Sequence, residues 1–395
     1  MSEHSHELIP LCVPEIRGNE GAYIKECLDT NWISSVGAYV DRFENDLAAR
    51  VDTSHAVATV NGTAALHIAL LLADVKPGDE VLVSTLTFIA PANAIRYVGA
   101  WPVFMDADPV YWQMDPDKAK DFLEQECKLD GGVLCNKTTG RRVKAIIPVH
   151  VLGHPVDMDP ILELAERFNI IVIEDATEGL GATHKGRRAG GMGDAGCFSF
   201  NGNKLITTGG GGMITTNNSD WARRAKYLTT QAKDDPIEYI HGEIGYNYRP
   251  TNIQAAMGCA QMEKLDEYIA AKRRIAQTYA TAFEGVPGIS PMKESNDAFS
   301  VYWMYTVLVD REKYGMDSRE LLRLFGESNI QTRPLWQPLH MSPAHLSCQS
   351  YHCDAAERLH RDALSLPCSV GLTEEQQDGV ISVIHENADR TGTAK

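Results

Sequence analysis

The stretch Ile170-Ile171-Val172-Ile173-Glu174-Asp175 decides the fold of this chain. Four β-branched apolar residues in a row leave no polar face, so a strand over Ile170–Glu174 has to be covered on both sides. Such strands are typical of a mostly parallel sheet with helices packed on each face. Ligands of these sheets bind where the strands end, so the polar residues after Ile173 are the first place to look for a site.

Short β-branched runs alternate with longer amphipathic runs on both sides of this stretch, which is the pattern of an α/β protein. We predict strands over Ala56–Thr59, Glu80–Ser84, Pro102–Asp106, Val143–Val149, Ile170–Glu174, Cys197–Phe200 and Gly212–Thr215. We predict helices over Glu20–Leu28, Tyr39–Val51, Thr63–Ala73, Ala90–Tyr97, Pro116–Glu126, Met158–Phe168 and Asp220–Thr229.

The chain is expected to divide near residue 250 into two parts. Residues 1–250 would form an opening segment and a large domain, and residues 251–395 a linking helix and a smaller α+β domain. Apolar residues at Met262, Leu265 and Ile269 recur at helical spacing and predict the linking helix. The smaller domain would contain a strand over Tyr302–Val309 and helices over Ser318–Phe325 and Thr373–His385.

The formal net charge of −16 argues against nucleic acid as the main partner, because that partner requires a basic surface. No basic N-terminal segment precedes an apolar run, and no apolar stretch approaches the length of a membrane span. We therefore expect a cytoplasmic protein without a membrane partner. The odd number of cysteines, nine, indicates reduced thiols rather than a disulfide framework. The His and Cys residues between His340 and Cys353 match no usual zinc-ligand spacing, and no metal is expected.

Two glycine-rich segments look like nucleotide-binding loops but occur in the wrong context. The segment Gly191-Met-Gly-Asp-Ala-Gly196 has the spacing of the dinucleotide fingerprint, which has to follow a strand and open a helix. Here a polar turn comes first and a strand follows, so we interpret it as a tight turn before a strand. The run Gly209–Gly212 also leads into a strand, which indicates a flexible turn or a close backbone approach near a ligand.

Asp175 and Lys204 carry the chemistry that the pattern predicts. Both follow predicted strands and therefore lie at strand ends. A buried carboxylate needs a cation or hydrogen-bond donors, and a pyridinium nitrogen would be such a cation. A lysine amine at the same edge could form an imine with the aldehyde of the same cofactor. The alternatives stay open, since an Asp at a strand end is often a cap or ion-pair partner and a loop Lys is often solvated.

A phosphate site is indicated where Asn61-Gly62-Thr63-Ala64-Ala65 joins a strand to a helix. Backbone N–H groups and the Thr63 hydroxyl could hold a phosphate at the positive end of that helix. An ordinary helix cap by Asn61 or Thr63 is compatible with this hypothesis. Phe88 follows another strand, where its ring could stack on a planar cofactor or simply fill the core.

The chain resembles the DegT/DnrJ/StrS sugar aminotransferases, of the fold-type I pyridoxal-phosphate group, from Ile9 to about residue 385. The matching segments are Trp32-Ile-Ser-Ser-Val-Gly37, Asn61-Gly-Thr-Ala64, Phe88-Ile-Ala-Pro-Ala-Asn-Ala-Ile95, Pro148-Val-His-Val-Leu-Gly153, Glu174-Asp-Ala-Thr-Glu178, Phe198-Ser-Phe-Asn-Gly-Asn-Lys204, Gly245-Tyr-Asn-Tyr-Arg249 and Arg333-Pro-Leu-Trp-Gln-Pro-Leu-His340. The resemblance implies a pyridoxal 5'-phosphate enzyme with a large domain, built on a mostly parallel sheet flanked by helices, and a smaller C-terminal α+β domain.

The resemblance also implies a role for each matching residue. Lys204 would be the catalytic Schiff-base lysine, and the cofactor would be bound by Gly62, Thr63, Ala64, Phe88, Asp175, Glu178, Ser199 and Asn247. Among these, Asp175 would pair with the ring nitrogen, Phe88 would stack on the ring, and Asn247 would reach the phosphate of a neighbouring subunit in a homodimer. Glu178 stands where the family commonly has Gln, and a carboxylate there would repel the ring oxygen. His150 and Arg333 are the candidate substrate contacts, each with a structural alternative.

Within the family, Asn201-Gly-Asn-Lys204 and Thr229-Thr-Gln-Ala-Lys-Asp-Asp235 look most like the C4 aminotransferases of the bacillosamine and legionaminic acid routes. This resemblance implies glutamate as the amino donor and UDP-linked 4-keto-6-deoxy-N-acetylglucosamine as the acceptor. Related enzymes take GDP- or dTDP-linked sugars, so the nucleotide stays open. A sugar dehydratase with the same cofactor would have a histidine in place of Lys204, and a non-catalytic regulator is the remaining alternative.

Overall fold

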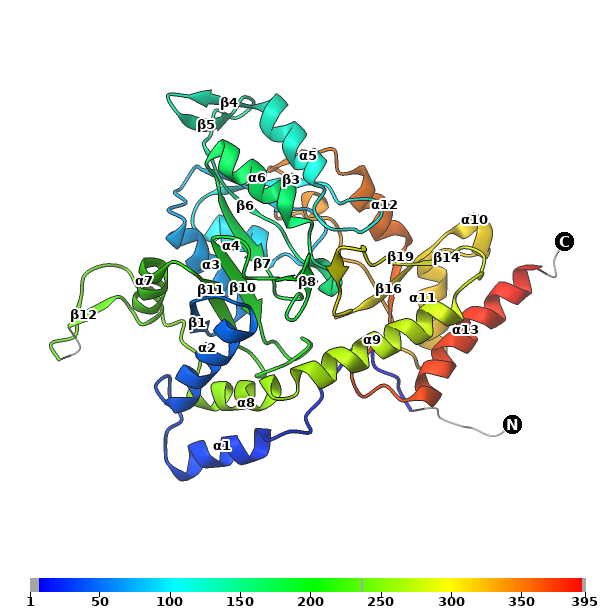
Figure 1. The fold of residues 1–395 in the computed structure, drawn as a ribbon. Coiled ribbons are helices and arrows are strands. Elements are labelled where there is room, and N and C mark those ends of the chain that lie inside the picture. Colours follow the sequence, from blue (N-terminus) through cyan, green and yellow to red (C-terminus); the bar gives the residue numbers. More distant parts are fainter. Residues whose placement is uncertain (1–6, 236, 393–395) are drawn as a thin grey trace.

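The computed structural model describes residues 7–235 and 237–392, and its main feature is an eight-stranded sheet (Figure 1). Across the sheet, the strands are β1 (His55–Thr59), β11 (Gly212–Thr216), β10 (Ala195–Ser199), β7 (Ile171–Asp175), β6 (Val143–Ile147), β2 (Glu80–Ser84), β3 (Trp101–Met105) and β18 (Gln349–Tyr351). Strand β11 runs antiparallel to both neighbours, and every other neighbouring pair is parallel. The predicted fold, a mostly parallel sheet of an α/β protein, is confirmed.

Helices cover both faces of this sheet. They are α3 (Gly62–Leu72), α4 (Ala90–Tyr97), α5 (Pro116–Asp121), a π-helical turn (Phe122–Glu126), α6 (Met158–Phe168) and α7 (Ser219–Thr229). Helices α3, α4 and α7 pack in a core that contains Ile173, whereas α5, the π-helical turn and α6 pack in a core that contains Val172. Neighbouring residues of β7 thus face opposite cores, because side chains alternate along a strand.

Helices also lie at the edge of the large part and connect it to the rest of the molecule. They are α1 (Glu20–Asp29), α2 (Ala38–Arg50), α8 (Asn252–Met262) and α9 (Leu265–Ala282). Helices α1 and α2 pack on α8, and α9 runs from there to the C-terminal part, as Figure 1 shows. The single linking helix that we predicted is interrupted at Glu263 and Lys264. The Glu263 carboxylate there accepts hydrogen bonds from Asn19 and Tyr23.

The C-terminal part contains a four-stranded antiparallel sheet, in the order β14 (Ile289–Pro291), β16 (Tyr305–Val309), β19 (Ala363–Leu366) and β17 (Arg333–Pro334). Its helices are α10 (Arg311–Tyr314), α11 (Ser318–Glu327), α12 (Asp354–Asp362) and α13 (Glu374–Gly392). The strand predicted from Tyr302 begins only at Tyr305, because Tyr302 has a left-handed backbone with φ of 48°. Residues 303 and 304 line a cavity instead.

The expected division at residue 250 does not separate the two sheets. Strand β18 lies after residue 250 yet pairs in parallel with β3 at the edge of the large sheet. The N-terminal segment crosses in the opposite direction, since Ile9 exchanges backbone hydrogen bonds with Asn329 and Gln331. Backbone pairing therefore joins the two parts of the chain in both directions.

Both glycine-rich segments are turns before strands, as we interpreted them. The turn before β10 wraps around the buried Glu174 carboxylate, which accepts the N–H groups of Gly190, Met192 and Gly193 at 2.6–2.8 Å. The second segment enters β11, where a side chain on Gly212 would collide with the backbone of Asn61. This close approach places β11 directly beside the start of α3.

The remaining elements are short. They are β4 (Cys127–Asp130), β5 (Val133–Asn136), β8 (Thr183–His184), β9 (Arg187–Arg188), β12 (Lys233–Asp235), β13 (Ile240–His241) and β15 (Ala298–Phe299), with 3-10 turns at Val151–Gly153 and Leu339–Met341. Within the described residues, no helix is both long and apolar enough to cross a bilayer.

Candidate active site

A cavity of about 560 Å³ lies where the ends of β7 and β10 meet the start of α3 and the C-terminal part. Asp175 and Lys204 both line it, so the structure brings together the two residues that the sequence singled out. The cavity wall also contains Gly62, Thr63, Phe88, Glu178, Ser199 and Arg333. Residues at the strand ends of the large sheet thus share one cavity with residues of the C-terminal part.

Asp175 is the last residue of β7 and its side chain is buried. One carboxylate oxygen accepts the backbone N–H of Thr177 at 3.2 Å. Burial raises the pKa of Asp175 because the charged form loses its hydration, while Thr177 and Lys204 oppose this effect. A cation at the open side of the carboxylate would stabilise the ionised form, as a pyridinium nitrogen can.

Lys204 lies in the turn that follows β10, where its backbone N–H bonds to the carbonyl oxygen of Asn201. Its Nζ lies 3.3 Å from Oε1 of Glu178 and 4.2 Å from the centre of the Trp303 ring. The side chain is only 13% exposed, so the amine reaches the cavity rather than bulk solvent. Trp303 also donates its indole N–H to the Asn203 carbonyl at 2.8 Å, which fixes the turn that carries the lysine.

Glu178 is buried beside Lys204, and its other oxygen accepts the backbone N–H of Leu152 at 2.8 Å. Burial raises the pKa of Glu178, and the positive charge of Lys204 counteracts this effect. Whether this carboxyl is ionised therefore depends on whether Lys204 carries a positive charge.

Gly62 and Ser199 form one corner of the cavity. A Cβ on Gly62 would lie 2.8 Å from the Cβ of Ser199, so only glycine allows this approach. The N–H groups of Gly62 and Thr63 belong to the first turn of α3 and have no acceptor within the helix, which suits an anion. The N–H of Ala64 already donates to Asn61 Oδ1 at 2.8 Å, and Ala64 does not line the cavity. Asn61 thus caps the helix at Ala64, and phosphate binding by Ala64 stays a prediction.

Phe88 lies between β2 and α4 and lines the cavity with 56% of its side chain exposed. An apolar ring this exposed at a cavity wall has a free surface on which a planar group can stack. The alternative that Phe88 fills the core is wrong. Arg333, at the start of β17, is also exposed and lines the cavity from the opposite part of the chain.

The expected substrate contact at His150 is a structural imidazole instead. Its side chain is fully buried and does not line the cavity. The Nδ1 atom accepts the backbone N–H of Val156 at 3.0 Å, so the proton sits on Nε2, which lies 2.9 Å from Glu174. Both ring nitrogens thus have partners inside the protein. The sequence placed His150 at a strand end but could not show which way the ring points.

Asn247 is exposed and does not line the cavity of its own chain. Its backbone forms a bridge with Thr230. This position is compatible with a contact to another subunit, which stays a prediction.

Sequence reasoning did not identify several residues of the cavity wall. They are Cys12, Trp303, Met304, Gln331 and Trp336. The Trp303 and Trp336 rings are stacked with an angle of 3° between their planes and centres 6.3 Å apart. Trp336 lay within a matched segment, whereas Trp303 lay in a predicted strand.

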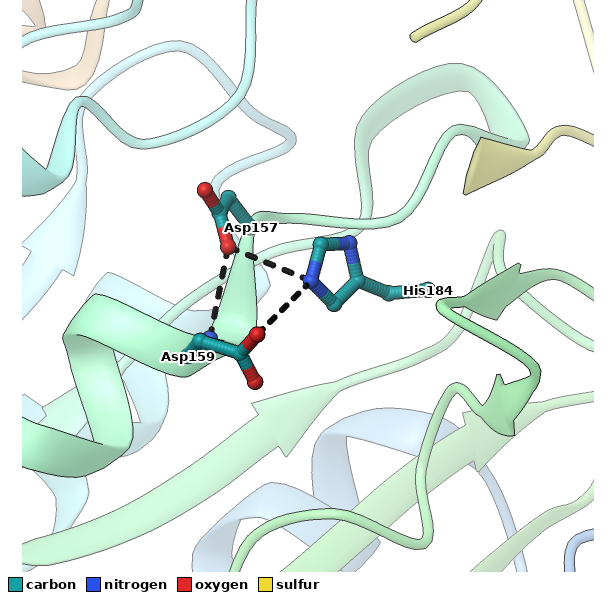
Figure 2. A group of neighbouring side chains, drawn as sticks. All are labelled: Asp157, Asp159 and His184. Atoms are coloured by element: carbon teal, nitrogen blue, oxygen red, sulfur yellow. Dashed lines mark hydrogen bonds and ion pairs between the residues drawn. The ribbon is translucent and has the colours of Figure 1, made fainter. Parts of the chain in front are cut away.

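A separate polar cluster contains Asp157, Asp159 and His184, shown in Figure 2. The His184 side chain is 4% exposed, and its Nε2 lies 3.2 Å from Asp157 in an ion-pair contact without hydrogen-bond alignment. Asp159 also pairs with Lys185, at 2.7 Å, and with Arg187. Because Asp159 is already paired with both cations and Asp157 caps α6, we interpret the cluster as an ion-pair network that fastens β8 and β9 to α6.

Comparison with known proteins agrees with this arrangement. The family model described as the DegT/DnrJ/EryC1/StrS aminotransferase family matches residues 14–385. A GDP-perosamine synthase of Caulobacter vibrioides is 40% identical and one of Escherichia coli O157:H7 is 41% identical, each over 96% of this chain and 98% of the relative. A solved structure of DesI with its TDP-sugar product has a TM-score of 0.86 and 26% identity, over 97% of this chain and 93% of that one.

Proposed function

Because this chain belongs to the DegT/DnrJ/EryC1/StrS aminotransferase family, we propose that it transfers an amino group to C4 of a GDP-linked 4-keto-6-deoxy sugar. At the coarser level the chain is a pyridoxal-phosphate-dependent aminotransferase that acts on sugar nucleotides. The observation that carries the proposal is the meeting of Lys204 and Asp175 in one cavity at the ends of parallel strands.

The identity of the nucleotide rests on the relatives. Two GDP-perosamine synthases are 40% and 41% identical to this chain along almost their whole length, which supports a GDP-linked acceptor. The acceptor expected from the segments around Lys204 and Thr229, UDP-4-keto-6-deoxy-N-acetylglucosamine, is the competing proposal. Both acceptors contain a ketone at C4, so the same residues would act on either.

Lys204 is the residue to which we assign proton transfer. When bound, pyridoxal phosphate supplies an electron-withdrawing ring that stabilises negative charge on the carbon bearing the amine. The Lys204 amine lies at the cavity wall, where Nζ as a free base could take a proton from that carbon and deliver it to the carbon on the other side of the nitrogen. The Trp303 ring, 4.2 Å from Nζ, limits how far the amine can swing away.

Asp175 and the start of α3 would hold the cofactor at its two ends. The buried carboxylate of Asp175 would pair with the ring nitrogen and keep it protonated, as an anion in a low dielectric does. Gly62, Thr63 and Ser199 would bind the phosphate, and the exposed ring of Phe88 would stack on the cofactor plane. These partners fit the group because each supplies the opposite charge, a donor or a flat apolar surface.

Arg333 would contact the substrate from the C-terminal part. Its guanidinium is exposed at the cavity wall, where it can pair with the diphosphate of a GDP- or UDP-linked sugar. Glutamate would be the amino donor, and its carboxylates would require a cation in the same space. We further propose a homodimer in which Asn247 completes the phosphate site of the neighbouring subunit.

The test is the absorbance spectrum of the purified holoenzyme, recorded first with glutamate and then with each keto sugar. We expect a band near the visible edge to fade with glutamate and to return with the GDP-linked sugar faster than with the UDP-linked sugar. Faster return with the UDP-linked sugar would reverse the choice of nucleotide. An absorbance band that responds to no amino donor would favour the alternative that the protein is a non-catalytic regulator. Lys204→Ala should abolish turnover while the circular dichroism spectrum stays that of the folded protein.

A further inference from the structure

Three side chains form a cluster behind the cavity that the proposed reaction does not use. They are Cys12 in the N-terminal segment, Lys272 in α9 and Cys368 after β19. The Lys272 Nζ lies 3.6 Å from the sulfur of Cys12 and 3.5 Å from that of Cys368. Two thiols and one amine from distant parts of the sequence thus meet at a single point.

Lys272 is 2% exposed and donates to the backbone carbonyl of Trp303 at 2.8 Å. Among residues 7–235 and 237–392, no carboxylate oxygen lies within ion-pair distance of this amine. A buried ammonium needs a negative partner, because its desolvation is costly when it stays unpaired. The two sulfur atoms beside it are the groups that can supply this charge, one of them as a thiolate.

The two cysteines are not equivalent. Cys368 is buried, and its S–H donates to the Trp303 carbonyl at 3.5 Å. The neighbouring Cys12 and burial together raise the pKa of Cys368. Cys12 lies beside Cys368 and the positive charge of Lys272, and both lower the pKa of Cys12. Cys12 is also the one that lines the cavity. We therefore assign the negative charge to Cys12, which lines the cavity, and the proton to Cys368, whose S–H has the Trp303 carbonyl as its acceptor.

We propose that Cys12 is a reactive thiolate that hydroperoxides oxidise and that then closes to a disulfide with Cys368. In the first step the Cys12 thiolate attacks the terminal O–H oxygen of the hydroperoxide, and the O–O bond breaks. Cys12 keeps this O–H group as a sulfenic acid, and the other oxygen leaves as alkoxide, or as hydroxide from hydrogen peroxide, and takes a proton from solvent. In the second step the Cys368 sulfur attacks the sulfenic sulfur, and water leaves with the Cys368 proton. The peroxide takes two electrons, one from each sulfur.

The backbone already holds the two cysteines side by side. The N–H of Cys368 donates to the carbonyl of Leu11 at 2.9 Å, and the N–H of Val13 donates to the Ser369 hydroxyl at 3.0 Å. The residues before and after Cys12 are therefore tied to Cys368 and its neighbour. A disulfide would need side-chain rotation rather than a rearrangement of either segment.

Oxidation of this cluster would reach the catalytic lysine. Cys12 contacts the carbonyl of Asn203, next to Lys204, at 3.6 Å. Lys272 contacts the carbonyl of Trp303, whose ring lies against the Lys204 amine. A disulfide removes the negative partner of Lys272 and reorients the sulfur that lies beside the Asn203 carbonyl. We expect turnover to fall on oxidation and to recover on reduction.

The first experiment measures alkylation of each cysteine in the holoenzyme by iodoacetamide, using peptide mass spectrometry between pH 6.5 and 8.5. An ordinary thiol reacts about tenfold faster for each pH unit in this range, whereas a thiolate reacts at a nearly constant rate. We expect a constant rate for Cys12 and a rising rate for Cys348, whose pKa is raised by burial. For each cysteine we compare the alkylation rates at two pH values, because their ratio does not depend on how easily iodoacetamide reaches that cysteine. A rate for Cys12 that rises as steeply as that of Cys348 would overturn the proposal.

The second experiment treats the holoenzyme with hydrogen peroxide and searches for a peptide pair linked through Cys12 and Cys368. We expect this pair to appear, to vanish with dithiothreitol, and to be absent in Cys368→Ser, where Cys12 should accumulate as a sulfenic or sulfinic acid. Cys348→Ser is the control and should form the linked pair normally. The absence of the pair from oxidised wild-type enzyme and its control would contradict the proposal.

Variants of Lys272 test whether the positive charge of Lys272 keeps Cys12 in the thiolate form. In Lys272→Met the rate of Cys12 alkylation should recover its dependence on pH, while Lys25→Met, a change at an exposed helix position, should leave the rate constant. If Lys272→Met does not fold, the wild-type pH profile alone decides, because it requires no substitution. A constant rate in folded Lys272→Met would show that Lys272 is not the cause.

Discussion

Oε1 of Glu178 lies 3.3 Å from Nζ of Lys204, and both side chains are almost enclosed by the protein. Two opposing influences act on this carboxyl, since burial raises its pKa and the lysine charge lowers it. The pKa is raised overall, so burial has the larger effect. A glutamine at this position would keep the acceptor for Leu152 without the charge.

The first prediction concerns Glu178→Gln and the pH dependence of stability. A carboxyl whose pKa is raised on folding binds its proton more tightly in the native state. It therefore favours folding most below its ordinary pKa of 4.5 and loses this contribution as the pH rises through the raised value. We expect the variant to melt at about the same temperature as wild type near pH 4.5 and about 2 °C higher at pH 8.

Melting curves of the two proteins from pH 4.5 to pH 8, followed by circular dichroism, measure this difference. The exposed Glu163→Gln serves as control and should show no pH-dependent gain. A variant that is less stable than wild type at pH 8 would mean that the ion pair with Lys204 outweighs burial.

The second prediction concerns Asp175→Asn. The amide cannot balance a positive ring nitrogen, so the charge developing in the reaction loses its partner. We expect turnover to fall by about a hundredfold or more, because removing one preorganised electrostatic group costs that much. Steady-state kinetics with glutamate and the keto sugar measure the loss.

The exposed Asp29→Asn is the control for this change and should keep normal turnover. A decrease in turnover of less than about threefold in Asp175→Asn would show that this carboxylate has no major role in the reaction. Equal melting temperatures of the variant and wild type would show that the loss is not caused by unfolding.

The sequence predicted the large sheet well because its strands are local apolar runs. Strand β2 and helices α4 and α6 have the predicted bounds, and most other elements of the large part differ by one or two residues at their ends. The failures occur where distant contacts decide. The break between α8 and α9 has no proline or glycine to indicate it, and Tyr302 leaves the strand through a left-handed backbone that few non-glycine residues adopt.

The site was partly predictable for the same reason. Asp175 and Lys204 could be expected at one sheet edge, since the ends of neighbouring parallel strands meet there. Trp303 and Cys12 enter the cavity from segments that no local pattern connects to that edge. Conversely, His150 has the sequence position of a site residue, but its ring turns inward to Glu174. A strand-end position alone does not fix the direction of a side chain.

The third prediction concerns Gly62→Ala. The new methyl group would lie 2.8 Å from the Cβ of Ser199 and 3.3 Å from the Phe198 carbonyl oxygen. Since β10 and the start of α3 would have to separate, we expect the affinity for pyridoxal phosphate to fall at least tenfold. Fluorescence titration of the cofactor-free protein measures this affinity.

Gly21→Ala is the matched control, because a Cβ on Gly21 of α1 meets nothing within 4 Å. This variant should bind the cofactor normally and gain about 0.5–1 kcal/mol of stability from the better helix propensity of alanine. Unchanged cofactor affinity in Gly62→Ala would show that the phosphate does not bind at this corner of the cavity.

The fourth prediction distinguishes the two roles considered for His150. In His150→Phe the N–H of Val156 loses its acceptor and the Glu174 carboxylate loses the Nε2 proton donor, both in the protein interior. Glu174 keeps the N–H groups of Gly190, Met192 and Gly193, so only the Val156 N–H is left without a partner. Since one unpaired buried polar group costs about 1–3 kcal/mol, the free energy of unfolding should fall by about 1–3 kcal/mol. Because the ring does not reach the cavity, KM for the sugar nucleotide should stay within about twofold of wild type. Urea denaturation and steady-state kinetics on the same preparation measure both quantities. A large increase in KM with unchanged stability would restore His150 as a substrate contact and would require its ring to turn toward the cavity when the sugar binds.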